Sequence, residues 1–372
     1  MSRWAWAEVD LGAIEHNVEV LREVVAPADL WAVVKADGYG HGALPVASAA
    51  LRGGASGLCV ALVQEGVALR HAGIGAPILV LSEQPPSDLA DAVRHRLTCT
   101  VYSTAQVDAL ADAARVTQTE QVGVHVKVDT GMRRVGAEPD DAAQVLDAIA
   151  GAAPHLRLAA MFTHLAIADE PDDEFTPAQL ARFADVVERA GAAGHVAPVV
   201  HAANSAAALA HPASRLSMVR AGIAIYGISP GPGVDHLTSR LRPALSLRAR
   251  VGHVKRVRSG ERVSYGLRHT FAADTNLATV PIGYADGVPR RLSSVGGEVL
   301  IHGRRHPIVG VVTMDQVMVD VGDGPVAIGD DVTLIGSQGS ETITAFDWAT
   351  PLGTIGYEIV CGISRRVERR YT

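Results

Sequence analysis

The chain has 372 residues, and at ~150 residues per domain this length predicts two domains, or one barrel with a further domain attached. Hydrophobic residues make up 48% of the sequence, which excludes a disordered chain because there is ample apolar surface to bury. The formal net charge of −7 argues against a protein that coats nucleic acid. Of the 33 basic residues only Lys35, Lys127 and Lys255 are lysines, so each is a candidate for chemistry that arginine cannot perform.

The first two thirds of the chain alternate short apolar runs with amphipathic helical segments. Strands buried on both faces of a parallel sheet are continuous apolar runs, and crossover helices separate them. The eight predicted strands are 30–34, 57–61, 77–81, 97–101, 122–128, 158–162, 197–200 and 218–226. The predicted helices include 11–25, 43–52, 87–94, 105–114 and 178–192. Eight such units predict a (β/α)8 TIM-like barrel. A doubly wound open sheet is the alternative, although no GxGxxG sequence follows the first strand.

The pattern changes after residues 229–233 (SPGPG), a turn-rich segment that cannot continue a helix. From Leu245 to Val251 apolar and polar residues alternate, which is typical of a half-buried strand. We therefore expect a barrel domain in residues 1–238 and a mostly β domain in residues 239–372. Further strands are predicted at 277–282, 299–302, 309–321 and 332–335, with a short helix at 346–350.

The cysteines Cys59, Cys99 and Cys361 lie far apart in apolar, strand-like runs, so we expect buried free thiols. No Cys-x-x-Cys pair is present, which excludes a zinc knuckle. Residues 1–10 lack the basic segment and apolar core of a signal peptide, and the longest stretch without charged side chains, 190–214, is too polar for a membrane span. We expect a soluble, cytoplasmic protein.

In a barrel the chemistry takes place where the strands end. Lys35 directly follows the first predicted strand. It is either a strand-end lysine whose ammonium reaches water, or a Schiff-base lysine that must lose a proton held with a pKa of ~10.4. Lys127 lies between Val126 and Val128 and is expected in a crowded interior, where an ammonium needs a partner.

Polar residues follow the later strands as well. His164 follows the sixth predicted strand, His201 directly follows the seventh and Arg220 lies in the eighth. Taken singly, His164, His201 and Ser205 are each more typical of a structural role than of a functional one. Their joint occurrence at successive strand ends favours a functional site. The groups suited to a phosphate at strands seven and eight are Asn204, Ser205 and the backbone amides of Gly222 and Ile223.

The segment 33–41 (VVKADGYGH) closely resembles the pyridoxal-phosphate (PLP) attachment motif of alanine racemases. Further segments resemble motifs of that family in the same order: 127–132 with Arg134 and Gly136, 201–205, 219–222, 263–266, 281–287, 313–316 and 356–358. The resemblance covers nearly the whole chain. It implies a PLP-binding barrel followed by a β domain, with residues 1–10 paired to that second domain.

The resemblance also implies roles at the cofactor. Lys35 would hold PLP as a Schiff base. Arg220 would face the pyridine nitrogen, with His201 beside it, and a cation there disfavours protonation of that nitrogen. The other residues implied at the cofactor are Tyr39, His164, Asn204, Ser205, Gly222, Ile223 and Tyr357.

The implied reaction is the interconversion of L-alanine and D-alanine, which supplies D-alanine for peptidoglycan. Racemisation needs one base on each face of the substrate Cα. By resemblance Lys35 acts on D-alanine and Tyr265 on L-alanine, with His164 in contact with Tyr265. Since Tyr265 reaches the PLP of the other subunit in this family, a homodimer with shared active sites is implied.

Substrate contacts are implied too. Arg134 matches the residue at the substrate carboxylate and the phenolic oxygen of PLP, and Met314 of the partner chain matches a backbone contact to that carboxylate. Tyr284 and Tyr357 look like a narrow entrance that favours a small side chain. Lys127 matches a position often carbamylated, which would give Arg134 an anionic partner. The residues implied around these groups are Lys127, His201, Tyr284 and Asp315. Thr313 stands where the family often has cysteine.

Four alternatives remain at this point. A PLP carrier on a lone barrel would lack the β domain and Tyr265. A decarboxylase of the same fold would need a cysteine-centred motif in the β domain, which we do not find. A metal hydrolase with a carbamylated lysine would need a His-x-His pair, which is absent, and no metal is expected. A Schiff-base aldolase could use Lys35 but would have no need of the phosphate-binding residues.

Overall fold

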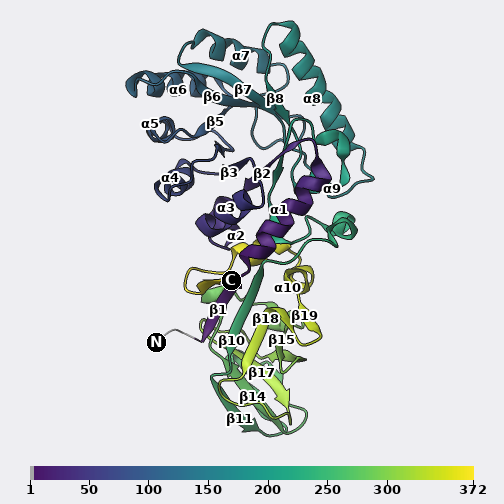
Figure 1. The fold of residues 1–372 in the computed structure, drawn as a ribbon. Coiled ribbons are helices and arrows are strands. Elements are labelled where there is room, and N and C mark those ends of the chain that lie inside the picture. The colour runs from purple at the N-terminus through teal and green to yellow at the C-terminus, as the bar shows by residue number, and fades with distance from the viewer. Residues whose placement is uncertain (1–3) are drawn as a thin grey trace. The chain divides into compact units, whose positions relative to one another are not determined.

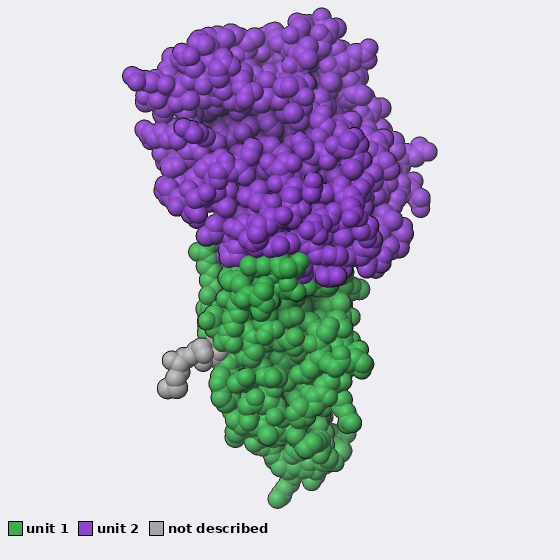
Figure 2. All heavy atoms as spheres, viewed as in Figure 1, with its two compact units in different colours: residues 1–12, 39–42, 243–372 green, residues 13–38, 43–242 purple. Residues whose placement is uncertain are grey.

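The computed structural model of the protein describes residues 4–372, which form two compact units (Figure 2). Unit 1 contains the described residues up to Gly12, the segment Tyr39–Gly42 and Pro243–Thr372. Unit 2 contains Ala13–Gly38 and Ala43–Arg242. The short segment that follows Lys35 therefore belongs with the C-terminal part of the chain.

Unit 2 is built on a closed barrel of eight parallel strands, as predicted. The ring closes where the first and last strands pair, with Leu30 opposite Val219. The barrel excludes the open doubly wound sheet. Its strands are β2 (Asp29–Val33), β3 (Gly57–Val60), β4 (Ile78–Val80), β5 (Thr98–Val101), β6 (Val122–Lys127), β7 (Leu156–Phe162), β8 (Val199–His201) and β9 (Met218–Ala221).

Helices lie on the outside of this ring (Figure 1). They bury alanine, valine and leucine side chains on the strands and expose their charged faces, as amphipathic crossover helices do. The helices are α1 (Leu11–Val25), α3 (Ala43–Arg52), α4 (Val63–His71), α5 (Pro86–Arg94), α6 (Thr104–Val116), α7 (Ala142–Gly151), α8 (Phe175–Ala192) and α9 (Ser205–Ala210), with 3-10 turns η1 (Pro212–Ser214), η2 (Ile223–Tyr226) and η3 (Pro232–Thr238). The segment labelled α2 (Lys35–Tyr39) is a left-handed turn rather than an α-helix.

The last predicted barrel strand is shorter than expected. The apolar run 218–226 is extended only as far as Ala221 and then forms the 3-10 turn η2. Gly222, with φ −103° and ψ −104°, takes the chain out of the strand conformation at this point. The error arose because η2 is buried on all sides, so its residues are as apolar as those of a buried strand.

Unit 1 is a sheet with the order β11-β14-β17-β16-β15-β18-β10-β1-β20, with β19 paired to β18. Its pairs are antiparallel except that β1 lies parallel to β20. The strands are β1 (Ala5–Val9), β10 (Leu245–Arg250), β11 (His253–Val257), β14 (Thr275–Val280), β15 (Glu298–Ile301), β16 (Arg304–Val309), β17 (Val317–Gly322), β18 (Asp331–Gln338), β19 (Glu341–Ile343) and β20 (Glu368–Tyr371). Beside it are the hairpin β12 (Arg262–Val263) and β13 (His269–Thr270), the helices α10 (Ala345–Leu352) and α11 (Gly356–Cys361), and the 3-10 turns η4 (Tyr265–Leu267), η5 (Tyr284–Asp286) and η6 (Leu292–Val295).

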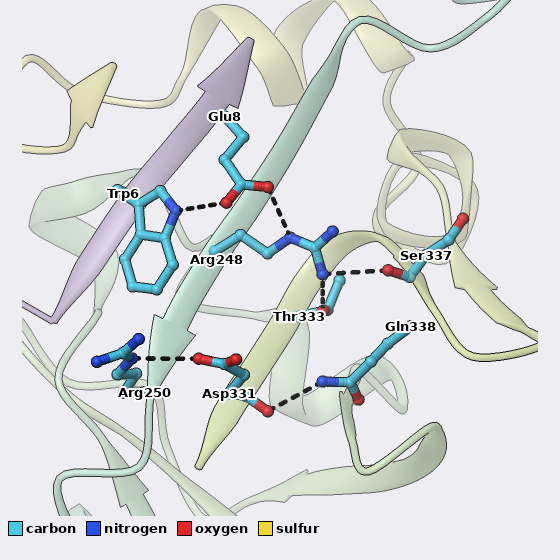
Figure 3. A network of polar contacts seen from close by, with 8 residues as sticks. All are labelled: Trp6, Glu8, Arg248, Arg250, Asp331, Thr333, Ser337 and Gln338. Atoms are coloured by element: carbon cyan, nitrogen blue, oxygen red, sulfur yellow. Dashed lines mark hydrogen bonds and ion pairs between the residues drawn. The ribbon is translucent and has the colours of Figure 1, made fainter. Parts of the chain in front are cut away.

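A polar network attaches β1 to the C-terminal part of the chain (Figure 3). The Glu8 carboxylate accepts hydrogen bonds from Trp6 Nε1 at 2.9 Å and from Arg248 Nε at 3.3 Å. The guanidinium groups of Arg250 and Arg370 lie 5.7 and 4.6 Å from the centre of a Trp6 ring. Strand β1 is thus part of the sheet of unit 1; of the segment 1–10 predicted to pair there, residues 1–3 lie outside the described residues.

Two expectations for the C-terminal part were wrong. The run 309–321 is two strands, because β16 ends at Val309 and a turn that starts at Gly310 (φ +72°) leads to β17. Cys361 is exposed at the end of the short helix α11, whose inner face is formed by Ile359 and Val360. Cys59 and Cys99 are buried free thiols as predicted, and burial raises the pKa of each to about 12.

None of the helices formed by residues 4–372 combines the length and hydropathy that a membrane span requires.

Candidate active site

Three of the side chains predicted at the strand ends of the barrel lie around the ring of Phe162, the last residue of β7. The His201 ring stacks on it, with centroids 4.6 Å apart and an interplanar angle of 5°. The Arg220 guanidinium lies 5.1 Å from the ring centroid and Lys127 Nζ lies 5.7 Å from it. Side chains from β6, β7, β8 and β9 therefore form one cluster inside unit 2.

Arg220 is the buried cation at the centre of this cluster. Its side chain donates to His201 Nδ1 at 2.6 Å and to His164 Nδ1 at 3.1 Å. It also donates to the carbonyl oxygens of Thr163 and Ala202 at 3.0 and 2.9 Å. All four acceptors are neutral groups, and burial lowers the pKa of Arg220 to about 10. None of these four acceptors is a carboxylate. A buried positive charge with neutral acceptors can bind an anionic or electron-rich ligand.

The histidines around Arg220 are neutral and their tautomers are fixed. A guanidinium can only donate, so Nδ1 of His201 accepts and its proton is on Nε2. That proton is donated to His125 Nδ1, 3.1 Å away. Burial, followed by the charge of Arg220, lowers the pKa of His201 and His164 well below 6.5 and that of His125 to about 3. His164, which accepts from Arg220 through Nδ1, likewise has its proton on Nε2.

Lys127 is buried among cations. Burial is the largest cause that lowers its pKa to about 8, and the charges of Arg134, Arg220 and Lys35 add to it, while Asp129 opposes them. Burial is also the largest cause that lowers the pKa of His164. Four cations lower it further: Arg220, Lys127, Arg134 and Lys35. These residues thus share one strongly positive region at the ends of the barrel strands.

The chain takes a left-handed turn directly after Lys35. Ala36, Asp37 and Gly38 have φ and ψ values near +55° and +47°, and the positive φ values continue through Tyr39 and Gly40. For L-residues this conformation costs roughly 1–2 kcal/mol each. Such a run persists only where the surroundings hold it in place.

The phosphate site predicted at β8 and β9 centres on Ser205. Its Oγ accepts hydrogen bonds from the amides of Gly222 at 2.8 Å and Ala224 at 3.3 Å. The hydroxyl proton of Ser205 is then left to donate to a further acceptor. Asn204 is the N-cap of α9, where its Oδ1 accepts from Ala207 N, and the buried Ile223 opens η2. The binding of phosphate by these residues stays a prediction.

The loop that carries Arg134 is held by Asp129. The Asp129 carboxylate accepts from the amides of Gly131, Arg133 and Arg134 at 2.9 to 3.1 Å. Burial by itself would raise the pKa of Asp129, but these three amides outweigh it and the pKa is lowered. The Arg134 side chain is exposed.

Unit 1 contains the remaining predicted residues. Tyr265, Tyr284 and Met314 have 74%, 41% and 52% of their surface exposed. The Tyr265 hairpin is tied to the following turn because Ser264 Oγ donates to the carbonyl oxygen of Val311 at 3.0 Å.

A second set of bonds holds the turn 313–316. Tyr284 N donates to Thr313 O and Ala285 N to Met314 O, at 2.9 and 3.1 Å. The Thr313 hydroxyl donates to Gln316 O at 2.9 Å within this turn, and Asp315 forms an ion pair with Arg366 at 2.6 Å. The chain thus holds the Met314 backbone rigidly beside Tyr284.

Tyr39 and Tyr357 also belong to unit 1, where their rings lie 6.2 Å apart. Arg369 Nε donates to the carbonyl oxygen of Gly40 at 2.9 Å, and its other nitrogens donate to the carbonyls of Ile363, Ser364 and Val367. A Cβ atom on Gly40 would clash with the Val360 carbonyl. The segment 39–42 is therefore fitted closely to the C-terminal residues.

Comparison with known proteins identifies this arrangement. Residues 9–230 match the alanine racemase N-terminal domain, and residues 244–371 match the alanine racemase C-terminal domain. An alanine racemase of Symbiobacterium thermophilum is 48% identical over 370 residues, which cover 99% of this chain and 97% of the relative. The chain belongs to the alanine racemase family. Alanine racemases are PLP-dependent.

Solved structures of the family have the same fold. The alanine racemase of Bacillus anthracis with bound L-Ala-P superposes with a TM-score of 0.93 at 40% identity, covering 100% of this chain and 96% of that one. A histidine racemase of Leuconostoc mesenteroides superposes with a TM-score of 0.89 at 30% identity, covering 100% and 98%. The fold is thus shared by racemases whose names give different substrates.

The residues of unit 2 fit PLP. The cofactor carries a phosphate and a phenolic oxygen, and the four cations around His164 provide a matching positive region. Ser205 retains a hydroxyl proton for an oxygen acceptor, and Arg220 is buried with neutral partners only among its acceptors. Lys35 lies in this region, and PLP attaches to a protein through a lysine side chain.

Three residues that lie next to the predicted ones, His125, Phe162 and Glu65, were not predicted from the sequence. His125 extends the chain of hydrogen bonds from Arg220, and Phe162 is the ring around which the cluster forms. The signal for His125 was the period of two in a strand, which places it on the same face as Lys127. Glu65 holds the residue after Lys35; its signal was a glutamate at the third position of a helix, where it reaches back to the helix start.

Proposed function

We propose that this protein is a PLP-dependent alanine racemase that uses Lys35 and Tyr265 as its two bases. The observation that carries the proposal for this chain is the cluster around Arg220, in which a buried cation is surrounded by neutral histidines next to Lys35 and Lys127. The full-length similarity to alanine racemases supports alanine as the substrate.

When bound through Lys35, PLP supplies an electron sink that acidifies the Cα proton of the amino acid. Arg220 is proposed to face the pyridine nitrogen and to keep it unprotonated, since a fixed cation disfavours a second positive charge. Ser205 would donate its hydroxyl proton to the phosphate, and the amides of Gly222 and Ile223 would lie beside it. Tyr39, Asn204 and Tyr357 are proposed to complete the surroundings of the phosphate.

Lys35 Nζ and the Tyr265 hydroxyl are proposed to move the proton on opposite faces of Cα. A phenol has a pKa of ~10, so Tyr265 needs help to act as a base near neutral pH. We propose that His164 gives it by hydrogen bonding. His164 is neutral and has its proton on Nε2, so it can donate to the phenolic oxygen but brings no positive charge.

Arg134 is proposed to bind the substrate carboxylate, and the Met314 backbone of a partner chain to contact the same group. Tyr284 and Tyr357 would restrict the entrance to small side chains. Asp315 would fix the turn of Met314 through Arg366. Lys127 is proposed to be carbamylated, so that its new carboxylate neutralises Arg134; His201 would orient Arg220.

We further propose a cytoplasmic homodimer that makes D-alanine for peptidoglycan. Tyr265 and Met314 lie exposed on unit 1, which fits a role at the active site of a partner chain.

The reaction is tested with purified protein, L-alanine and a chiral assay for D-alanine. We expect the visible absorbance of lysine-bound PLP, its loss on borohydride reduction, and a modified Lys35 in the peptide map. L-serine and L-histidine are assayed in parallel. Protein that stays colourless and inactive with added PLP would exclude the racemase, and a preference for L-histidine would reassign the substrate.

The shared site is tested by mixing Lys35→Ala with Tyr265→Ala after subunit exchange. Each variant is expected to be inactive alone, and the mixed dimer to regain activity because one of its two sites has both bases. Absence of recovery in dimers proven to be mixed would exclude a site shared between chains.

A further inference from the structure

The turn after Lys35 is held by one carboxylate of the barrel. Glu65 Oε1 accepts a hydrogen bond from Ala36 N at 2.7 Å. Glu65 Oε2 accepts from Ala61 N at 2.8 Å and from Leu62 N at 3.1 Å, at the start of α4. The side chain therefore joins the end of β2 to the end of β3.

The hydrogen bond from Ala36 N to Glu65 fixes the backbone conformation at Lys35. Ala36 N belongs to the peptide that begins with the Lys35 carbonyl, so its position sets the ψ angle of Lys35. Ala36 is also the first residue of the left-handed run, with φ +53°. The bonds that support the rest of the run, from Gly38 N to Val34 O and from Ala43 N to Asp37 Oδ1, do not involve this peptide.

We propose that Glu65 is a positioning residue for Lys35, which keeps the Lys35–Ala36 peptide in the conformation that places Nζ for attachment of PLP. The inference rests on one part of the proposed function, the attachment of the cofactor to Lys35. Glu65 itself does not touch the reacting atoms. A carboxylate is needed because both of its oxygens accept, whereas the amide of glutamine has one acceptor oxygen.

The barrel offers a matched control in Glu83. Its carboxylate accepts from the amides of Tyr102 and Ser103, each at 2.7 Å, and from the Ser103 hydroxyl. Glu83 is half-buried like Glu65 and joins the loop after β4 to the end of β5. It thus also bridges neighbouring strand ends, but both amides donate to the same oxygen, Oε1, and it does not contact the turn after Lys35.

The experiment compares Glu65→Gln and Glu83→Gln in the full-length protein by three measurements. These are the unfolding midpoint, hydrogen exchange at the amides of residues 36–38, and the dissociation constant for PLP. We expect Glu65→Gln to lose stability because its bonds are divided between two oxygens, whereas the one oxygen of Glu83→Gln can still accept from both amides. Only Glu65→Gln is expected to exchange faster at residues 36–38 and to bind PLP more weakly, by about tenfold.

A double variant separates strain from loss of folding. Glycine adopts positive φ without the penalty of alanine, so Ala36→Gly in the Glu65→Gln protein is expected to recover part of the PLP affinity. Unchanged PLP affinity and unchanged exchange in Glu65→Gln would overturn the inference, and so would an equal loss of affinity in Glu83→Gln. If wild type and Lys35→Ala bind PLP alike, the proposed function fails instead; the exchange at residues 36–38 still decides whether Glu65 holds the turn.

Discussion

Arg220 and His201 are joined by a hydrogen bond of 2.6 Å in which the guanidinium donates to Nδ1. The bond fixes the His201 proton on Nε2, and His125 accepts it. One buried cation thereby sets the tautomers of two histidines. Burial, followed by the charge of Arg220, lowers the pKa of both and keeps them neutral.

Stability is expected to fall below pH 6.5, because histidines that are neutral in the fold take up protons when the chain unfolds. The pKa of His125 is lowered from 6.5 to about 3 in the folded protein. Between these two pH values the unfolded chain binds more protons than the folded one, so the contribution of His125 to the free energy of unfolding is lost as the pH falls from 6.5 towards 3. His125→Asn keeps an acceptor for His201 and removes the titration. Its unfolding free energy should fall less steeply with acid than that of wild type, by up to about 1.4 kcal/mol per pH unit. His253→Asn, at an exposed histidine of β11, is measured in parallel as the control variant.

Lys127 is expected to carry CO2. Only a neutral amine reacts with CO2, and the pKa of about 8 makes that form available near neutral pH. The nitrogen forms a bond to carbon and releases one proton, so the adduct should diminish as the pH falls below about 8. NMR with labelled bicarbonate should detect it in wild type and not in Lys127→Met. Lys255→Arg, an exposed position, should retain the signal and full activity. A bare amine at Lys127 in bicarbonate would contradict the prediction.

Ser205→Ala is expected to weaken PLP binding by about tenfold, because it removes a hydroxyl donor and leaves the amides of Gly222 and Ala224 without their acceptor. Titration of PLP by absorbance measures the effect. Ser217→Ala is the matched control, since Ser217 Oγ also accepts from a backbone amide of the barrel, that of Val200. If Ser205→Ala and Ser217→Ala bind PLP with equal affinity, Ser205 does not bind the phosphate.

Arg369→Leu is expected to destabilise the protein by about 2–4 kcal/mol, because four backbone carbonyls, including that of Gly40, lose their donor. Urea unfolding gives the loss, and hydrogen exchange should quicken at residues 39–42. The neighbouring Arg370→Leu removes an exposed ion pair with Glu368 and the contact with Trp6, and it should cost about 1 kcal/mol or less. A similar loss of unfolding free energy in both variants would show that the contact between Arg369 and Gly40 does not contribute more to stability than an exposed ion pair.

Much of the fold follows from the order of residues. The spacing of apolar runs and amphipathic segments predicts eight strands with helices between them, since buried parallel strands and crossover helices have distinct periods. The alternation from Leu245 onward predicts the change to a β domain. The pattern failed where burial was complete on all sides, as in Ile223–Tyr226, because an apolar run then has no period to distinguish strand from turn.

The sequence by itself determined which residue types are available for the chemistry. Motifs around Lys35, Lys127, Arg220 and Tyr265 pointed to the family because they are local in the chain. The tertiary structure alone decided what these residues contact. His125, 76 positions from His201, is a partner of it only because β6 and β8 both face the barrel interior. Glu65, 29 positions from Ala36, reaches it only because β2 and β3 are neighbours. Hydrogen bonds and charge act over a few ångströms of space, and that distance is set by the closed barrel rather than by position in the chain.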